Sequence, residues 1–459
     1  MEKVNINKNL MEKIKKYDGL IHVVLIATKP DIIKQAPLII ELKKRKEFVI
    51  IIHSGQHYDW NLSGGLEEEF NIEPDINLNV KGLLYEQQSQ IIDRLGYILS
   101  ELKALNKQVI PYIYGDTTSA VAGGIASFAN MICSAHVEAG LRTMSPPKSI
   151  IMSLLEDFSV EEYFEELKQN SSWLKGSYEP YPEQFDTRAA APSAGVHFAP
   201  TRINADSLLG EGYSSDRIFI VGNPVSDALN WIEHRVKKSD ILNRYPILAK
   251  GNVIRFCVHR RENIYSYHRF LAIYEAMEEL VYEGRTILFI SLGATEKALE
   301  TYKLKEKVLE LAEKYKNFIY SPVWPYYTDV IAAMKQCSVI ATDSGSIQEE
   351  TNILGIPGVV LRFNSDRPEA IFSGSNILSP PINKEVVFKI VSQVADNNDL
   401  NTKMRQSPKL YNEKVSEKIV DIIKKVSLED IHFNLFKFLE HEKLGLSKMS
   451  FWKDGETKW

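Results

Sequence analysis

The sequence has few cysteines and no long apolar run. Only Cys133, Cys257 and Cys337 occur among 459 residues, and each stands among apolar neighbours. An odd, widely spaced set of cysteines builds neither a disulfide framework nor a zinc site, so we expect reduced core residues in a cytoplasmic protein. The strongest early apolar run, residues 21–27, is too short to cross a bilayer, and no apolar signal core precedes it.

Cofactor fingerprints and a basic surface are lacking as well. Ala27-Thr28-Lys29-Pro30 follows the first strand-like run where a dinucleotide-binding G-x-G-x-x-G would stand, and there is no P-loop. No His, Cys or carboxylate spacing matches a known metal-ligand set. The chain has 55 basic and 60 acidic residues, a net charge of −5, which disfavours nucleic acid as a partner. We predict no cofactor, no metal and no membrane or nucleic-acid partner.

Strand-like and helix-like patterns alternate along the chain. With 44% hydrophobic residues, a chain of this length can bury two cores, so two domains are expected. The alternation predicts parallel sheets with helices on both faces. The predicted strands are 21–27, 48–52, 109–114, 196–199, 253–258, 286–290, 317–320, 338–341 and 359–361, and the predicted helices include 32–46 and 118–129.

Polar clusters follow five of the predicted strands. Because parallel sheets bind ligands beyond the carboxyl ends of their strands, we predict two doubly wound α/β domains that face a common cleft. Gly222-Asn223-Pro224 favours a break between the domains. The predicted parts are residues 20–222 with an insert at about 147–177, residues 223–410, and a helical tail at 411–459 that packs back on the first domain.

A strand–turn–helix unit at residues 339–369 is the strongest local signal of function. Ser344-Gly345-Ser346 would begin a helix whose free N–H groups could hold a phosphate, and Gly345 would allow close approach of a ligand. Glu350, one turn later, could accept from sugar hydroxyls, which suits a nucleotide sugar. Arg362 and Arg367 could hold the other side of a diphosphate. The alternative is an ordinary capped helix after a buried strand.

The acid–base candidates lie in the first half of the chain. Asp116 follows a strand, although it could be a plain helix N-cap. Glu138 is costly to bury without a purpose, although an ion pair with Arg142 could simply fix a loop. Glu183 stands where a loop enters a helix, a common place for a first-turn acid. His259 and the adjacent Arg260 end a strand and fit diphosphate binding, or a solvent-facing basic cluster.

These segments together resemble the UDP-N-acetylglucosamine 2-epimerase family, in particular its non-hydrolysing type. The resemblance spans roughly residues 20–420 and implies two Rossmann-like domains in the GT-B arrangement, with the active site in the interdomain cleft. The second domain would bind UDP. The matching stretches, in the family's order, are 54–57, 115–118, 136–143, 182–183, 197–201, 222–224, 259–263, 342–350 and 367–369.

The resemblance also implies a reaction. Family members interconvert UDP-GlcNAc and UDP-ManNAc by expelling UDP from C1 while a proton leaves C2, which gives 2-acetamidoglucal, and by adding UDP back after protonation on the other face. By motif match, the catalytic candidates are Asp116, Glu138, Glu183 and His259. The substrate-binding candidates are Lys29, Lys34, Gln56, His57, Arg142, Arg260, Ser344, Gly345, Ser346, Glu350 and Arg367. The resemblance implies a UDP-sugar partner and no cofactor, and it leaves room for a homodimer.

The chain departs from the family pattern at several places. Lys29 replaces an arginine and so loses the guanidinium fork, and Asp186-Thr187 replaces Asn-Arg, with Arg188 one place late. Asp59 stands at a position that some bacterial members use in an activator site. The substrate could therefore be a modified UDP-HexNAc. The alternatives are a hydrolysing epimerase that releases UDP and ManNAc, a GT-B glycosyltransferase, and a silent nucleotide-sugar sensor.

Overall fold

A computed structural model describes residues 4, 6–55 and 64–426 of the chain. Its first domain contains a seven-stranded sheet in the order β3-β2-β1-β4-β5-β8-β9, in which every pairing is parallel. Apolar residues occupy both faces of the central strands, as helices covering both sides of a sheet require. The strands are β1 (Ile21–Ile26), β2 (Phe48–His53), β3 (Ile76–Asn77), β4 (Val109–Tyr114), β5 (Ser134–Val137), β8 (Ala194–Ala199) and β9 (Ile218–Ile220).

The second domain contains a six-stranded parallel sheet in the order β12-β11-β10-β13-β14-β15. In both sheets the strand order reverses beside the domain's first strand, which is the Rossmann order. The predicted pair of doubly wound domains is therefore confirmed. The strands are β10 (Val253–Cys257), β11 (Thr286–Ser291), β12 (Phe318–Pro322), β13 (Cys337–Thr342), β14 (Gly358–Val360) and β15 (Asn376–Leu378).

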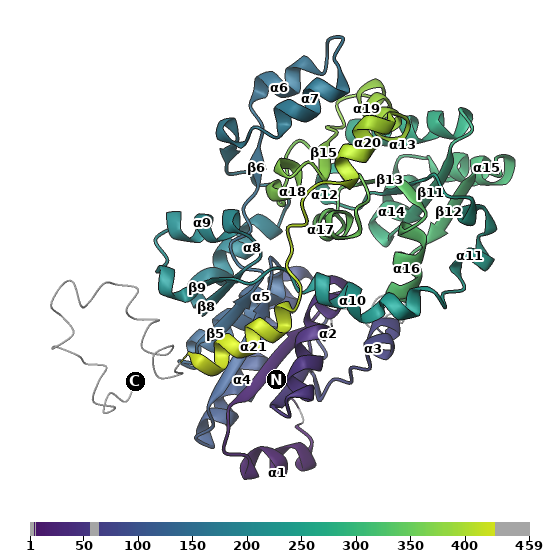
Figure 1. The fold of residues 1–459 in the computed structure, drawn as a ribbon. Coiled ribbons are helices and arrows are strands. Elements are labelled where there is room, and N and C mark those ends of the chain that lie inside the picture. The colour runs from purple at the N-terminus through teal and green to yellow at the C-terminus, as the bar shows by residue number, and fades with distance from the viewer. Residues whose placement is uncertain (1–3, 5, 56–63, 427–459) are drawn as a thin grey trace.

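Helices cover both sheets (Figure 1). In the first domain they are α1 (Lys8–Lys16), α2 (Lys29–Lys44), α3 (Gly65–Phe70), α4 (Leu84–Ala104), α5 (Thr118–Ala129), α8 (Glu183–Ala190) and α9 (Arg202–Gly210). In the second domain they are α10 (Val225–Val236), α11 (Ile241–Arg244), α12 (Arg261–Ile264), α13 (Tyr267–Tyr282), α14 (Gly293–Thr301), α15 (Lys305–Lys314), α16 (Tyr327–Met334), α17 (Gly345–Leu354), α18 (Pro368–Phe372), α19 (Lys384–Asp396) and α20 (Asn398–Arg405). Among the described residues, no helix is long and apolar enough to span a bilayer.

Local chemistry explains where α2 begins. The sequence predicts a start at residue 32, but the helix begins at Lys29 because the Asp31 carboxylate accepts from the backbone N–H of Thr28 at 3.0 Å. Pro30 in the first turn needs no hydrogen-bond acceptor there. The earlier start brings Lys29 into the helix and orients it towards the second domain.

The chain crosses between the domains twice. Gly222-Asn223-Pro224 leads from β9 into α10, and the chain returns after α20 to form α21 (Val415–Lys425) on the first domain. Figure 1 shows α21 beside α2. The apolar face of α21 is buried, and its Asp421 forms an ion pair with Arg45 beyond the end of α2. The predicted tail helix beyond residue 426 lies outside the described residues.

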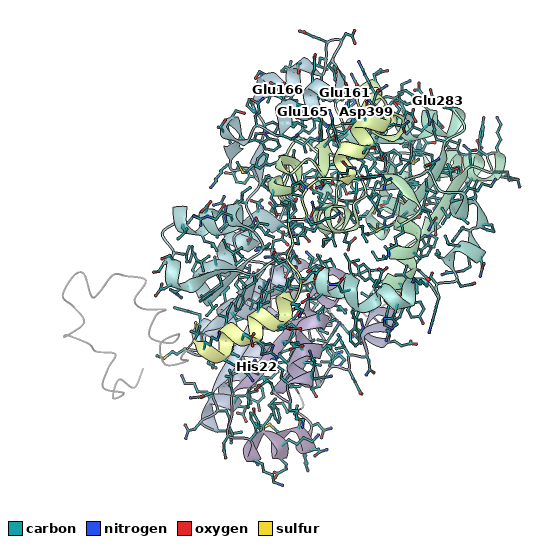
Figure 2. The ribbon with its side chains drawn as sticks, in the orientation of Figure 1. His22, Glu161, Glu165, Glu166, Glu283 and Asp399 are labelled. Atoms are coloured by element: carbon teal, nitrogen blue, oxygen red, sulfur yellow. The ribbon has the colours of Figure 1, made fainter. Side chains whose placement is uncertain are left out.

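The insert after β5 packs on the second domain. It comprises β6 (Met144–Ser145), α6 (Lys148–Ser153), α7 (Val160–Leu167) and β7 (Leu174–Lys175). Its apolar side chains join the second domain's core, and the Trp173 ring meets the Phe372 ring edge-on at 4.9 Å. Figure 2 shows the acidic side chains Glu161, Glu165 and Glu166 at the outer end of this domain. The insert thus packs at the periphery and contributes no side chain to the interdomain cavity.

The packing of the insert can be tested by truncating a core side chain. Phe164 is buried on α7 against the second domain, so we expect Phe164→Ala to lower the free energy of unfolding by about 3–5 kcal/mol. Glu162→Ala on the exposed face of the same helix should change it by less than about 0.5 kcal/mol. Chemical denaturation of both variants measures the difference. Equal stabilities would mean that the insert does not pack as described.

Candidate active site

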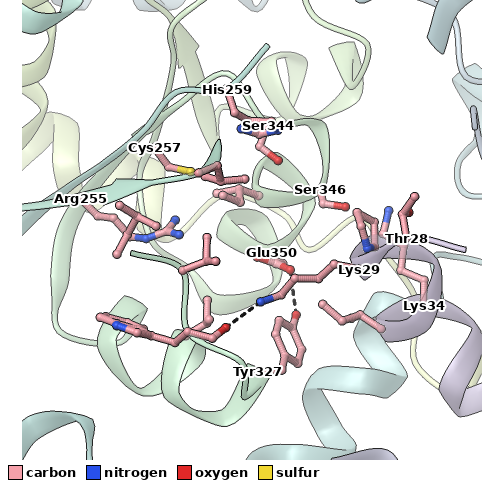
Figure 3. A pocket seen from close by; sticks show the side chains of 18 residues that line it. Thr28, Lys29, Lys34, Arg255, Cys257, His259, Tyr327, Ser344, Ser346 and Glu350 are labelled. Atoms are coloured by element: carbon pink, nitrogen blue, oxygen red, sulfur yellow. Dashed lines mark hydrogen bonds between the residues drawn. The ribbon is translucent and has the colours of Figure 1, made fainter. Parts of the chain in front are cut away.

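A cavity of about 300 Å³ lies between the two domains (Figure 3). The start of α2 forms one side of it, and the carboxyl ends of β10, β11 and β13 with α16 and α17 form the rest. It therefore opens at the strand ends where a ligand site was expected. The lining residues are Thr28, Lys29, Pro30, Ile33 and Lys34 of the first domain, and Arg255, Cys257, His259, Ile290, Leu292, Val323, Trp324, Tyr327, Val330, Ser344, Ser346, Ile347 and Glu350 of the second.

The start of α17 faces this cavity. Ser344 is the N-cap residue, and Ser344 and Ser346 both line the cavity. Gly345 is required for a steric reason, because a Cβ there would lie 2.9 Å from the Asp366 carboxylate and 3.4 Å from the Arg367 guanidinium. Free N–H groups of a helix start, flanked by hydroxyls, suit an anionic group.

Asp343 joins two of the strand ends. Its carboxylate accepts from the backbone N–H groups of His259 and Arg260 at 3.0 Å and from the Asn263 amide at 3.0 Å. This fixes the loop after β10 against the loop after β13. The His259 ring lies 3.4 Å from the same carboxylate, and burial lowers its pKa, so a neutral imidazole is expected near neutral pH.

A buried ion cluster connects the domains next to the cavity. The Lys34 ammonium lies 2.7 Å from Glu138 of the first domain and 2.5 Å from Glu349 of the second. The Arg367 guanidinium lies 2.5 Å from Glu349 and 3.2 Å from Glu138. The amide of Asn223, in the interdomain connection, donates to Glu138 at 2.8 Å. Two cations and two carboxyl groups thus share one water-excluded space.

The two carboxyl groups of the cluster are not equivalent. Burial opposes ionisation of Glu138, but the charges of Lys34 and Arg367 outweigh it and hold its pKa below the ordinary value. Burial and the neighbouring Glu138 carboxylate raise the pKa of Glu349 well above its ordinary value. Glu138 is therefore the anion, while Glu349 keeps its proton. Glu138 also has a φ of +62°, which is unusual for a side chain of this size and marks a constrained position.

Asp116 lies at the edge of the ion cluster. One of its carboxylate oxygens is 3.7 Å from Arg367, and the same oxygen has no hydrogen-bond partner in the described structure. Burial raises the pKa of Asp116 to about 6; Arg367 opposes the rise, and the charges of Glu138 and Glu183 add to it. The alternative that Asp116 caps a helix is not realised, because Thr117 is the N-cap residue of α5.

The remaining predicted residues of the second domain also converge here. Arg260 forms an ion pair with Glu183 at the start of α8. This pair is a second ionic contact between the domains, in addition to the buried ion cluster. Glu350 accepts a hydrogen bond of 2.8 Å from the Tyr327 hydroxyl inside the cavity. Across the cavity, the Lys29 ammonium donates to the Trp324 carbonyl at 2.9 Å, and burial lowers its pKa to about 8.

One predicted residue, Arg142, is not brought to the cavity. The Arg142 guanidinium donates to both oxygens of Glu211, at 2.7 and 2.6 Å, so it neither lines the cavity nor pairs with Glu138. Glu211 directly follows α9 of the first domain, so this ion pair holds Arg142 within that domain. Gln56 and His57 lie outside the described residues.

Some site residues were missed by sequence reasoning. Glu349 lies inside the helix predicted to begin at Ser344-Gly345-Ser346, and nothing local shows that it faces two cations from distant segments. Asp343 precedes the serine turn, and its role in holding two loops together depends on β10 and β13 being neighbours. Arg255 could have been found from the sequence, since a charged residue inside an otherwise apolar strand is unusual and indicates a special role. In the parts of the chain that the structure describes, no group of three or more His, Cys, Asp or Glu residues could hold a metal.

The unequal charges of the cluster give a stability prediction. Glu349→Gln replaces a neutral acid by a neutral amide and should cost less than about 1 kcal/mol near neutral pH, whereas Arg367→Met leaves buried carboxylates under-compensated and should cost about 3–5 kcal/mol. Chemical denaturation of both variants measures these costs.

The same pair of variants has a pH signature. An acid whose pKa rises on folding loses stability as pH increases above its unfolded value of 4.5, because only the unfolded chain then releases the proton. The free energy of unfolding of wild type should therefore fall relative to that of Glu349→Gln between pH 5 and pH 8. The fall should be at most about 1.4 kcal/mol per pH unit. A constant difference across that range would contradict a protonated Glu349.

Comparisons with known proteins agree with this geometry. The family model described as UDP-N-acetylglucosamine 2-epimerase matches residues 40–149 and 176–424, so the insert separates the two matched stretches. The UDP-N-acetylglucosamine 2-epimerase of Methanocaldococcus jannaschii is 30% identical over 407 residues, which cover 87% of this chain and 98% of that protein.

Solved structures of such enzymes share the fold. The enzyme of Neisseria meningitidis bound to UDP-GlcNAc is 26% identical with a TM-score of 0.73 and covers 89% of this chain and 100% of that chain. The Methanocaldococcus jannaschii enzyme in complex with UDP-GlcNAc and UDP is 27% identical with the same TM-score and the same shares of each chain. The predicted GT-B arrangement is thus confirmed, and the chain belongs to the UDP-N-acetylglucosamine 2-epimerase family.

Proposed function

We propose that this chain is a non-hydrolysing epimerase that interconverts UDP-GlcNAc and UDP-ManNAc. The observation that carries the proposal is the meeting of Asp116 and Glu138 with Arg367, next to the cavity between two Rossmann-like domains that the α17 start faces. The relatives named above bind UDP-GlcNAc or UDP and supply the substrate class.

The chemistry of the cavity supports an orientation for the substrate. The diphosphate would sit at the N–H groups of the α17 start, with the Ser344 and Ser346 hydroxyls, His259 and Arg260 around it. The ribose hydroxyls would donate to Glu350. The sugar would then lie towards Asp116 and Glu138. Lys29 and Lys34, on the opposite domain, would close the site over the nucleotide.

The proposed reaction is an elimination of UDP followed by its re-addition. The C1–O bond breaks with its electron pair going to UDP, while a proton leaves C2, so that C1 and C2 become double-bonded in 2-acetamidoglucal. A proton then adds to the other face of C2, and a UDP oxygen re-forms the bond to C1. Arg367 and the helix start would stabilise the charge that develops on the departing diphosphate.

Asp116 and Glu138 are suited to different roles. A carboxyl with a pKa of about 6 can both take and return a proton near neutral pH, which favours Asp116 as the group that exchanges the C2 proton. Glu138 is held ionised by Lys34 and Arg367, so it would instead fix Arg367 and keep Asp116 a stronger base. Glu183, held by Arg260, would be the acid–base group for the other face of the ring.

These roles predict the effect of removing each carboxylate. Asp116→Asn and Glu138→Gln should each lower kcat by about 100-fold or more, with a much smaller change in UDP-sugar binding. The first removes the group that exchanges the C2 proton, and the second removes the charge that fixes Arg367 and keeps Asp116 basic, while the phosphate contacts remain. Coupled assays of UDP-ManNAc formation measure kcat. Asp157→Asn on the insert, far from the cavity, is the matched control and should retain full activity. Near-normal kcat in both Asp116→Asn and Glu138→Gln would mean that these carboxylates have only structural roles.

The fate of the nucleotide distinguishes the proposal from its alternatives. In heavy water, both UDP-ManNAc and recovered UDP-GlcNAc should carry deuterium at C2, because the removed proton exchanges with solvent, and UDP should stay attached. Proton NMR of the reaction measures both. Stoichiometric free UDP with free ManNAc would indicate a hydrolysing epimerase. Absence of C2 deuterium with any UDP-HexNAc would favour a glycosyltransferase or a sensor.

A further inference from the structure

Arg255 is a buried cation that forms no salt bridge with the described residues, although the charge of Arg255 acts on Glu350 in the same cavity. It lies in the middle of β10, whose five residues are all buried, and its side chain is only 5% exposed. It forms no hydrogen bond or salt bridge to any part of the chain that the structure describes, and its Nη1 is fully enclosed without a partner. Burying a guanidinium in this way is costly, and such groups are normally paired. An acceptor in the space beside the guanidinium would therefore stabilise it.

That space is the interdomain cavity. Residues two apart on a strand share a face, so Arg255 and Cys257 both line the cavity, and Figure 3 shows Arg255 on the side opposite Thr28 and Lys34. The cavity wall at this end is aromatic and aliphatic, with Trp324, Tyr327 and Ile290 among its members. Flat apolar walls suit a nucleobase better than a phosphate.

The other polar groups at this end are already engaged. The Lys29 ammonium donates to the Trp324 carbonyl, and Glu350 accepts from the Tyr327 hydroxyl. Burial raises the pKa of the Cys257 thiol to about 11, so it stays neutral. Arg255 offers the guanidinium donors that no described residue accepts from, and a guanidinium has no acceptor atom. A ligand that fits must therefore present acceptors to it.

We propose that the Arg255 guanidinium donates a hydrogen bond to the carbonyl edge of the nucleobase, so that this site selects uracil over cytosine. This inference rests on the proposed function, because it assumes a nucleoside diphosphate in the cavity. Uracil offers the O4 carbonyl, which can accept from the guanidinium. Cytosine has an amino group at the same position, so two donors would face each other and the guanidinium would stay unpaired. A site built around a buried hydrogen-bonding group rejects a ligand that leaves that group unsatisfied.

Calorimetric binding of UDP and of CDP tests the proposal directly. Wild type should prefer UDP by about 5- to 150-fold, the range expected for one specific guanidinium–base pairing. Arg255→Met removes the donors but keeps the length of the chain, and its preference should fall to within about 3-fold, mainly through weaker UDP binding. Arg285→Met, which removes an exposed arginine paired with Asp396 in the same domain, should keep the wild-type preference.

Thermal unfolding without nucleotide gives a second readout. Because no described residue accepts a hydrogen bond from the Arg255 side chain, Arg255→Met should raise the midpoint, whereas loss of a structural arginine would lower it. Three results for Arg255→Met would overturn the proposed role of Arg255. They are an unchanged preference for UDP, an equal loss of affinity for UDP and CDP, and unfolding at a lower temperature than wild type. Failure of wild type to bind either nucleotide would overturn the proposed function together with it. Selective UDP binding without epimerisation would leave Arg255 in place and overturn the reaction alone.

Discussion

The structure depends on the buried ion cluster in which Lys34 and Arg367 hold Glu138 and Glu349 between the two domains. Each domain contributes one carboxyl group and one cation, so the cluster can be complete only when the domains are in contact. The desolvation of four ionisable groups is offset by short mutual contacts and by the proton that Glu349 retains. The relative placement of the domains and the charge of the cleft are therefore set by the same interactions.

The cluster also determines the acid–base character of the site. Asp116 borders Arg367 without being neutralised by it, because Arg367 is shared with three other carboxyl groups. Its pKa of about 6 follows from burial near further negative charge. A single arginine surrounded by carboxylates thus leaves one of them able to exchange protons near neutral pH. The constrained backbone of Glu138 keeps this arrangement in register.

The segment that the family model does not match has a structural consequence. Residues 150–175 leave the first domain between β6 and β7, yet they bury their apolar side chains on the second. The insert thus adds a packed contact between the domains to the two chain crossings, at Gly222-Asn223-Pro224 and before α21. The insert lies outside the cavity, so its effect on the site can act only through the domains that it joins.

Local patterns in the sequence determined much of this protein. Runs of buried apolar residues set the long strands of both sheets, and α5 occupies the predicted residues 118–129, because both signals arise within one segment. The strands β3, β5, β9 and β15 of the two sheets were missed, since segments of two to four residues rarely show a clear period. Family motifs indicated the cleft and its carboxylates. Tertiary structure alone decided that Arg367, not Arg142, pairs with Glu138 and that Glu349 completes the cluster. It also decided that the Arg255 side chain has no hydrogen-bond or salt-bridge partner among the described residues. Glu138 and Arg367 are 229 residues apart, and pairing in a buried site depends on which side chains the folded backbone brings within reach, which no local pattern encodes.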